Sequence, residues 1–190
     1  MPDWSYRTVL RPLMLAMGPE RSRRLATSTL STLGRLPFGL RAIDFLGHMR
    51  PDPRLRTRAG SIDLCGPIAL GALIDPRGDA LAAFARFGAG MIEVGPVAER
   101  ATDAVPEWRV DVGQRTIDCA QPITVSVDEV ERNLARADGG VAICVHIAKQ
   151  DGDAVRRIVA RLEQHAAMFV VDASNLEDAK SSKPVLRSAA

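Results

Sequence analysis

The first 53 residues carry apolar side chains at the spacing of amphipathic helices. Between Tyr6 and Met17 these side chains recur three and four residues apart, which predicts one helix. Pro12 lies inside that stripe, so the helix is kinked or begins late. Gly18-Pro19 separates it from a second predicted helix over Glu20–Leu36, because proline favours the first helical position. The apolar face of this second helix is expected to hold Leu25, Thr29, Leu33 and Leu36. A third, short helix is expected to hold Ala42, Phe45, Leu46 and Met49.

From Arg54 onward the pattern becomes one of short strands alternating with helices. Leu55–Thr57 and Ser61–Leu64 flank Ala59-Gly60, which predicts a hairpin. The strands expected after it cover residues 68–71, 91–94, 141–147 and 168–173, with a further short strand over 108–112. The expected helices cover residues 79–87, 127–137 and 153–165. Strands separated by helices predict βαβ units on a parallel sheet.

The predicted fold class is therefore α/β. Four strands of this kind are half of the eight that close a (β/α)8 barrel. We expect a partial (half) TIM-type barrel of parallel strands behind an N-terminal helical segment. The expected divisions are a basic amphipathic helical segment over 1–53, a half barrel over 54–174 and an irregular C-terminal arm over 175–190.

Composition adds limits to this interpretation. The 190 residues are 46% hydrophobic and 25% charged, as in an ordinary soluble domain. No apolar stretch approaches the ~18 residues that a membrane-spanning helix needs. The start is not expected to be a secretory signal, because only Leu13–Met17 is continuously apolar. Three scattered cysteines (Cys65, Cys119 and Cys144) predict reduced thiols in a cytoplasmic protein.

Charge is distributed unevenly along the chain. Residues 1–58 hold eleven Arg and four acidic residues, a net charge of +7, whereas residues 59–190 hold fourteen basic and nineteen acidic residues, a net charge of −5. A basic segment with apolar faces, ahead of an acidic body, indicates a docking element. The segment either forms an interfacial lid or simply caps the following domain. Nucleic acid is not an expected partner, because the aromatic rings of this segment fall on its apolar stripes. The residues expected to contact a membrane or partner are Arg21, Arg23, Arg24, Arg54, Arg56 and Arg58.

Two segments carry a family resemblance. The first runs Gly66-Pro67-Ile68-Ala69-Leu70-Gly71-Ala72-Leu73-Ile74-Asp75-Pro76-Arg77-Gly78, and the second runs Met91-Ile92-Glu93-Val94-Gly95-Pro96-Val97. With Gly18-Pro19-Glu20-Arg21 at the start of the second helix, they resemble the dihydroorotate dehydrogenases, and within them the membrane-associated, quinone-dependent class. The resemblance covers the N-terminal half of that family and implies a flavin (FMN) site, with N-terminal helices that dock on a membrane.

At several positions the chain departs from the family's site. The family's substrate-contacting lysine falls on Pro76, and a flavin-contacting threonine falls on Pro96. The flavin-binding asparagine falls on His146, and the serine that acts as base falls on Asn175, which cannot do general-base work near neutral pH. The positions that remain, as a vestigial cofactor-binding set, are Gly71, Ala72, Asp75 and Gly78. No metal site is expected, because His48, His146 and His165 lack metal-ligand spacing.

These substitutions predict a non-catalytic protein without a cofactor. We expect a structural or accessory subunit, cytoplasmic and peripheral to a membrane, docked on a membrane surface or an integral membrane protein complex. A half barrel leaves two sheet edges and one apolar face open, so a second copy, a different chain or the C-terminal arm must cover them. We also expect Asp172 to pair with His146 and Trp108 to pack against the sheet. The alternatives are an FMN-dependent dihydroorotate dehydrogenase-type enzyme completed by a partner chain, or a truncated gene product.

Overall fold

The computed structural model describes residues 6–47, 52–102, 107–111, 113–114, 116–121, 123–137 and 140–171. Its N-terminal part consists of a π-helical turn, η1 (Tyr6–Leu10), followed by three α-helices. These are α2 (Arg11–Met17), α3 (Pro19–Arg35) and α4 (Gly39–Gly47). α2 begins with Pro12 in its first turn, and α3 begins at Pro19 after Gly18, whose φ is +78°. The segment predicted as one helix is thus helical from Tyr6, and it changes from π-helix to α-helix at Arg11, next to Pro12. Met49 of the third predicted helix lies outside the described residues.

The buried face of α3 differs from the predicted one. Leu25 and Leu36 are 47% and 51% exposed, whereas Ser31 is buried and Leu30 packs against the core. The Leu30–Gly34 side of α3 faces α5 (Leu81–Phe84), and the more apolar side faces outward. A Cβ atom at Gly34 would lie 3.7 Å from the Cβ of Ala82, an ordinary van der Waals distance. The predicted face of Leu25, Thr29, Leu33 and Leu36 is wrong.

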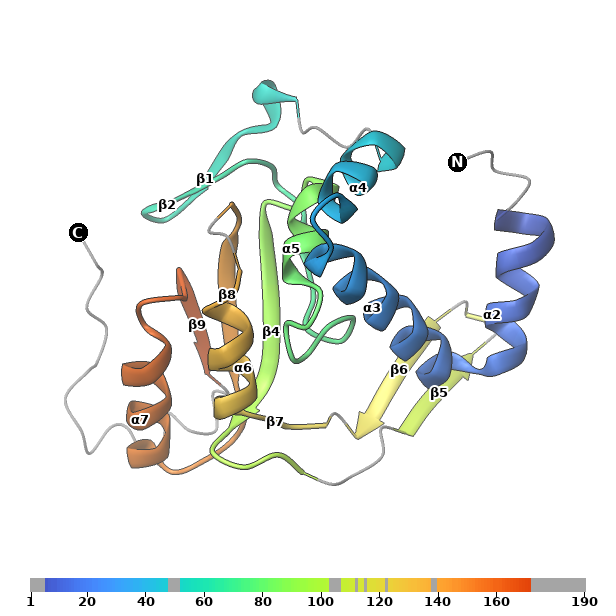
Figure 1. Cartoon of the computed structure of the whole chain (residues 1–190). Coiled ribbons are helices and arrows are strands. Elements are labelled where there is room, and N and C mark those ends of the chain that lie inside the picture. Colours follow the sequence, from blue (N-terminus) through green and yellow to red (C-terminus); the bar gives the residue numbers. More distant parts are fainter. Residues whose placement is uncertain are drawn as a thin grey trace.

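The body of the molecule is built on a parallel sheet. An antiparallel hairpin of β1 (Thr57–Ala59) and β2 (Ile62–Leu64) precedes it, as predicted. The sheet has the order β3-β4-β8-β9, with all neighbours parallel. Its strands are β3 (Ala69–Leu70), β4 (Met91–Ala98), β8 (Ala142–Ile147) and β9 (Met168–Val171). The two-residue β7 (Val125–Ser126) pairs with the end of β4. This arrangement confirms the partial barrel (Figure 1).

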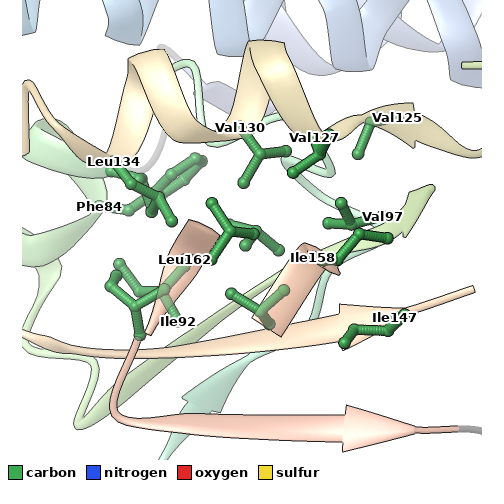
Figure 2. Close-up of a cluster of buried hydrophobic side chains, with 14 of the residues drawn as sticks. Phe84, Ile92, Val97, Val125, Val127, Val130, Leu134, Ile147, Ile158 and Leu162 are labelled. Carbon is green, nitrogen blue, oxygen red and sulfur yellow. The ribbon is translucent and has the colours of Figure 1, made fainter. Parts of the chain in front are cut away.

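The hydrophobic core lies between this sheet and the helices that connect its strands. These connections are α5 with the 3-10 turn η3 (Ala85–Phe87), α6 (Val127–Leu134) and α7 (Gly152–Leu162). Figure 2 shows Val130 of α6 facing Ile158 and Leu162 of α7, and all three are at most 1% exposed. Alternate side chains of a strand point to opposite faces, so the strand positions between the core residues lie on the other face of the sheet.

A second hairpin was only half predicted. β5 (Glu107–Asp111) matches the short strand expected over 108–112, and it pairs with β6 (Thr116–Gln121), which the sequence pattern did not indicate. β4 also runs beyond its predicted end at Val94, through Gly95-Pro96, with a shift of register between Val94 and Val97. Among the described residues, no helix is both long enough and apolar enough to cross a membrane.

Candidate functional site

The carboxyl ends of the parallel strands meet at one end of the sheet. In Figure 1 this is the end at which the arrowhead of β4 reaches β7. Side chains and loops at the carboxyl ends of parallel strands form the binding sites of α/β proteins. The candidate site is therefore the loop between β3 and α5, together with the residues that end β4 and β8.

The loop after β3 is held by a buried carboxylate. Asp75 is 2% exposed, and its two oxygens accept hydrogen bonds from the backbone N–H groups of Asp79 and Ala80 at 3.0 and 2.8 Å. Burial raises the pKa of the Asp75 carboxyl, and the two backbone hydrogen bonds oppose that shift. Asp75 therefore closes the turn that leads into α5.

Gly78 and Pro76 belong to the same turn. Gly78 has φ +71°, and a Cβ atom there would lie 2.9 Å from Cδ1 of Leu81. Pro76 is buried, and its carbonyl oxygen accepts a hydrogen bond from the N–H of Gly95 at 2.9 Å. Pro76, which stands at the position of the family's lysine, thus links the loop to β4 through its carbonyl oxygen. Gly78 provides a turn that other residues adopt only with strain.

A carboxylate and an imidazole meet on the face of the sheet opposite the core. Glu93 Oε1 of β4 lies 3.6 Å from Nδ1 of His146 on β8. The other oxygen, Oε2, accepts a hydrogen bond from the N–H of Ala72 at 3.3 Å. The predicted partner of His146, Asp172, lies outside the described residues. The pairing of β4 with β8 sets Cys144 opposite Glu93, so a register estimate could have found that Glu93 is the near neighbour of His146.

Cys144 lies beside this pair without being reactive. It is 3% exposed, and burial together with the charge of Glu93 raises the pKa of its thiol to about 11. A thiol that stays protonated near neutral pH is a poor nucleophile. The reduced thiols predicted from the sequence fit this environment for Cys144, and Cys65 donates to the carbonyl oxygen of Ala89 at 3.3 Å.

The loop after β8 is tied back to the end of β4. The side chain of Gln150 accepts a hydrogen bond from the N–H of Glu99 at 3.1 Å and donates to the carbonyl oxygen of Val97 at 3.4 Å. The Glu99 carboxylate pairs with Arg157 of α7 at 2.6 Å. The polar groups at this end of the sheet therefore bond to one another.

The six arginines predicted as contact residues do not form one surface. Arg21, Arg23 and Arg24 lie at the start of α3, whereas Arg54, Arg56 and Arg58 lie in or beside η2 (Pro53–Leu55) and β1. In Figure 1 the start of α3 and the β1–β2 hairpin lie at opposite ends of the molecule.

Several of these arginines already have partners within the chain. Arg23 binds Glu20 through two nitrogens and donates to the carbonyl oxygen of Ile74 at 3.3 Å, so it fastens α3 to the loop after β3. Arg54 pairs with Asp52 and Arg58 with Asp63, and each carboxylate raises the pKa of its guanidinium partner.

The side chains present do not fit the FMN that the family resemblance implies. Pro76 and Pro96 carry neither an amine nor a backbone N–H. The N–H of Ala72, next to the vestigial Gly71, is bound by Glu93, which places a carboxylate beside the position of the flavin-binding asparagine. Like charge there opposes an anionic flavin or substrate. The base position, Asn175, lies outside the described residues. No cluster of metal-ligating side chains occurs among residues that the structure describes.

The chain is similar in sequence to known dihydroorotate dehydrogenases. No protein-family profile matches the chain. It is 33% identical over 106 residues to the quinone-dependent dihydroorotate dehydrogenase of Kineococcus radiotolerans, which covers 56% of this chain and 29% of that protein. It is 30% identical over 148 residues to the enzyme of Nitrosomonas eutropha, covering 75% of this chain and 40% of that protein.

A solved structure shares the fold. The crystal structure of dihydroorotate dehydrogenase from Eimeria tenella in complex with ferulenol has a TM-score of 0.64 and 21% identity, and the match covers 81% of this chain and 43% of that chain. The resemblance to quinone-dependent dihydroorotate dehydrogenases is therefore confirmed over about half of the chain or more, and so is the partial-barrel fold. The chain spans only 29% and 40% of the lengths of the two curated relatives named above.

Proposed function

We propose that this chain is a non-catalytic, dihydroorotate dehydrogenase-like protein that docks on a membrane surface or membrane protein complex as a structural or accessory subunit. The observation that carries the proposal is a set of large apolar side chains exposed on the N-terminal helices and on the turn between α3 and α4. Their exposed fractions run from 40% to 74%. They are Leu10, Leu13, Leu15, Leu25, Leu36, Phe38 and Phe45.

Basic residues accompany this apolar surface. Arg21 and Arg24 lie on exposed positions of α3, and Arg41 lies over the ring of Phe38, 5.9 Å from its centroid. Basic amphipathic helices bind at the lipid interface through apolar burial and attraction to anionic headgroups. Each Lys or Arg near an anionic surface adds about 1 kcal/mol. A helical segment with a net positive charge is suited to such a surface.

The hydrogen bonds at the carboxyl ends of the strands support the non-catalytic part of the proposal. The buried Pro76 stands where the family has a lysine, and Gln150 is occupied by the end of β4. These contacts stabilise the fold. The loop after β3 contains no lysine, so it offers no side-chain amine to a substrate.

A partner that covers the second face of the sheet is part of the same proposal. Parallel sheets occur almost only with both faces covered. The helices α5, α6 and α7 cover one face through the core. On the other face the side chains of Glu93 and His146 are 31% and 33% exposed, and Val170 is 39% exposed. A partner chain or a second copy would bury them.

Flotation with lipid vesicles tests the membrane part of the proposal. The chain should float with vesicles that contain anionic lipid, bind neutral vesicles more weakly, and be released as salt rises to ~0.5 M, because ionic contacts are screened. Retention at high salt would replace electrostatic docking with apolar or protein–protein anchoring. Failure to bind either vesicle would contradict docking on lipid and leave a membrane protein complex as the surface to test.

The competing function is a flavoenzyme completed by a partner chain. It is favoured by the similarity to quinone-dependent dihydroorotate dehydrogenases. It predicts a yellow complex with bound FMN, whereas the non-catalytic proposal predicts a colourless protein that does not bind added FMN. Absorbance in the flavin band of the chain purified together with its partners distinguishes the two.

A further inference from the structure

We propose that the junction of α3, α5 and α6 is a binding site for a free, phosphate-sized oxyanion, held by Ser31, Arg35 and Arg136. A cavity of about 80 Å³ lies there, lined by the second half of α3, the segment that opens α5 and the end of α6. The cavity borders the loop after β3, whose Gly78, Asp79 and Ala80 line it, while its arginines come from α3 and the end of α6. The proposal does not depend on the function proposed above.

The Ser31 hydroxyl is the first indication of a ligand. Ser31 is 9% exposed and lines the cavity. The other hydroxyl side chains of α3 all donate to backbone carbonyl oxygens, as Thr27 does to Arg23 and Thr32 to Ser28. The side-chain hydroxyl of Ser31, by contrast, makes no hydrogen bond with any described residue. Burying a hydroxyl group without a hydrogen-bond partner destabilises the folded state, so a bound group that pairs with the Ser31 hydroxyl would stabilise the fold.

Two guanidinium groups provide the charge. Arg35 ends α3, Arg136 follows α6, and both line the cavity. Neither has a carboxylate within ion-pair distance in the part of the chain that the structure describes. The third ionisable residue in the lining, Asp79, accepts a hydrogen bond from Asn133 at 3.0 Å. The ionisable groups of the lining therefore sum to a net positive charge.

This combination selects an oxyanion over other small ligands. Guanidinium groups present planar pairs of donors that match the oxygens of phosphate or sulfate, and a serine hydroxyl donates a further hydrogen bond. The carbonyl ends of α3 and α6 also attract arginine, so the helix dipoles alone favour Arg35 and Arg136 at these positions. They do not account for the buried hydroxyl of Ser31, which has no partner in the described part of the chain, or for the cavity beside it.

Thermal unfolding of the full chain tests the site with inorganic phosphate. Phosphate should raise the midpoint saturably, by about 2–4 °C over chloride of equal ionic strength, because a ligand of the folded state stabilises it. Arg35→Gln and Arg136→Gln should each weaken the apparent affinity by about tenfold. Ser31→Ala, which keeps both charges, should also weaken it. Sulfate should substitute for phosphate.

Arg132→Gln is the matched control. Arg132 is an exposed arginine of α6 that donates to the carbonyl oxygen of Asp128 and does not line the cavity. Its substitution should leave the phosphate effect unchanged. An equal loss in Arg132→Gln and Arg136→Gln would show non-specific screening and overturn the proposal. The proposal would also be overturned if phosphate produced no saturable rise in the unfolding midpoint. It would likewise be overturned if Ser31→Ala, Arg35→Gln and Arg136→Gln, each tested singly, all kept the full rise.

Discussion

Gly78 shows how a family-like residue can be explained by the fold alone. Its φ of +71° is strained for any residue with a side chain, and a Cβ atom there would lie only 2.9 Å from Cδ1 of Leu81. We predict that Gly78→Ala lowers the free energy of unfolding by about 2–3 kcal/mol, from backbone strain and overpacking together. Chemical denaturation with urea measures it.

Gly60→Ala separates the two effects. Gly60 has φ +60°, but no atom lies within 4 Å of a Cβ built there, so only the strain of about 1 kcal/mol applies. Equal losses for the two variants would show that Leu81 moves aside freely and that Gly78 is needed only for its backbone angle.

Asp75 gives the protein a defined pH dependence. Burial raises its pKa above the ordinary value of 3.8, so the folded state holds this proton more tightly than the unfolded chain. The stabilisation from protonated Asp75 is fully present below pH 3.8 and is lost as pH rises through the raised pKa. We predict that the free energy of unfolding of the wild type, relative to Asp75→Asn, increases as pH falls from about 7 to 4. A decrease over that interval would show that the two backbone hydrogen bonds outweigh burial.

At the scale of elements, exposure of the N-terminal helices carries the docking proposal. Leu15 of α2 and Ile68, next to β3, are both 71% exposed. We predict that Leu15→Asp weakens binding to anionic vesicles by about tenfold, because a charge replaces an apolar group at the lipid interface. Ile68→Asp should leave binding unchanged, and neither variant should alter the unfolding midpoint by more than a degree or two. Equal effects on vesicle binding would place the docking surface elsewhere.

The order of the elements could be predicted because local patterns determine it. The strands β3, β4, β8 and β9 and the helices between them follow from short apolar runs and helical periodicity. β6 was missed because its sequence, Thr-Ile-Asp-Cys-Ala-Gln, holds only one large apolar residue and forms a strand by pairing with β5. The buried side of α3 was assigned wrongly because it followed the leucine stripe, whereas the packing of α3 on α5 buries the side that carries Leu30 and Ser31.

The candidate site was predictable at the level of positions but not of contacts. The resemblance located Pro76, Gly78 and His146 at the ends of strands. It could not show that the carbonyl oxygen of Pro76 binds Gly95 or that Glu93 is the neighbour of His146, because both contacts depend on strand register. The cavity beside Ser31 joins three elements distant in sequence, and no pattern along the chain indicates it.

At the scale of the whole molecule, the structure combines half of a barrel with a basic helical segment. One face of its parallel sheet is packed by helices, and the other carries the Glu93–His146 pair. The fold agrees with that of dihydroorotate dehydrogenase, while the loop after β3 is held by Asp75, Pro76 and Gly78 for structural reasons. Retained fold and altered site together are the basis of the non-catalytic proposal.

The most direct test is the visible absorption spectrum of the chain after gentle detergent extraction from its native membranes. The account predicts that a tagged chain is recovered from the membrane fraction, with its partners, and shows no flavin band. Recovery of the chain with stoichiometric FMN, in a yellow complex with a second half barrel, would contradict the claim that catalysis has been lost.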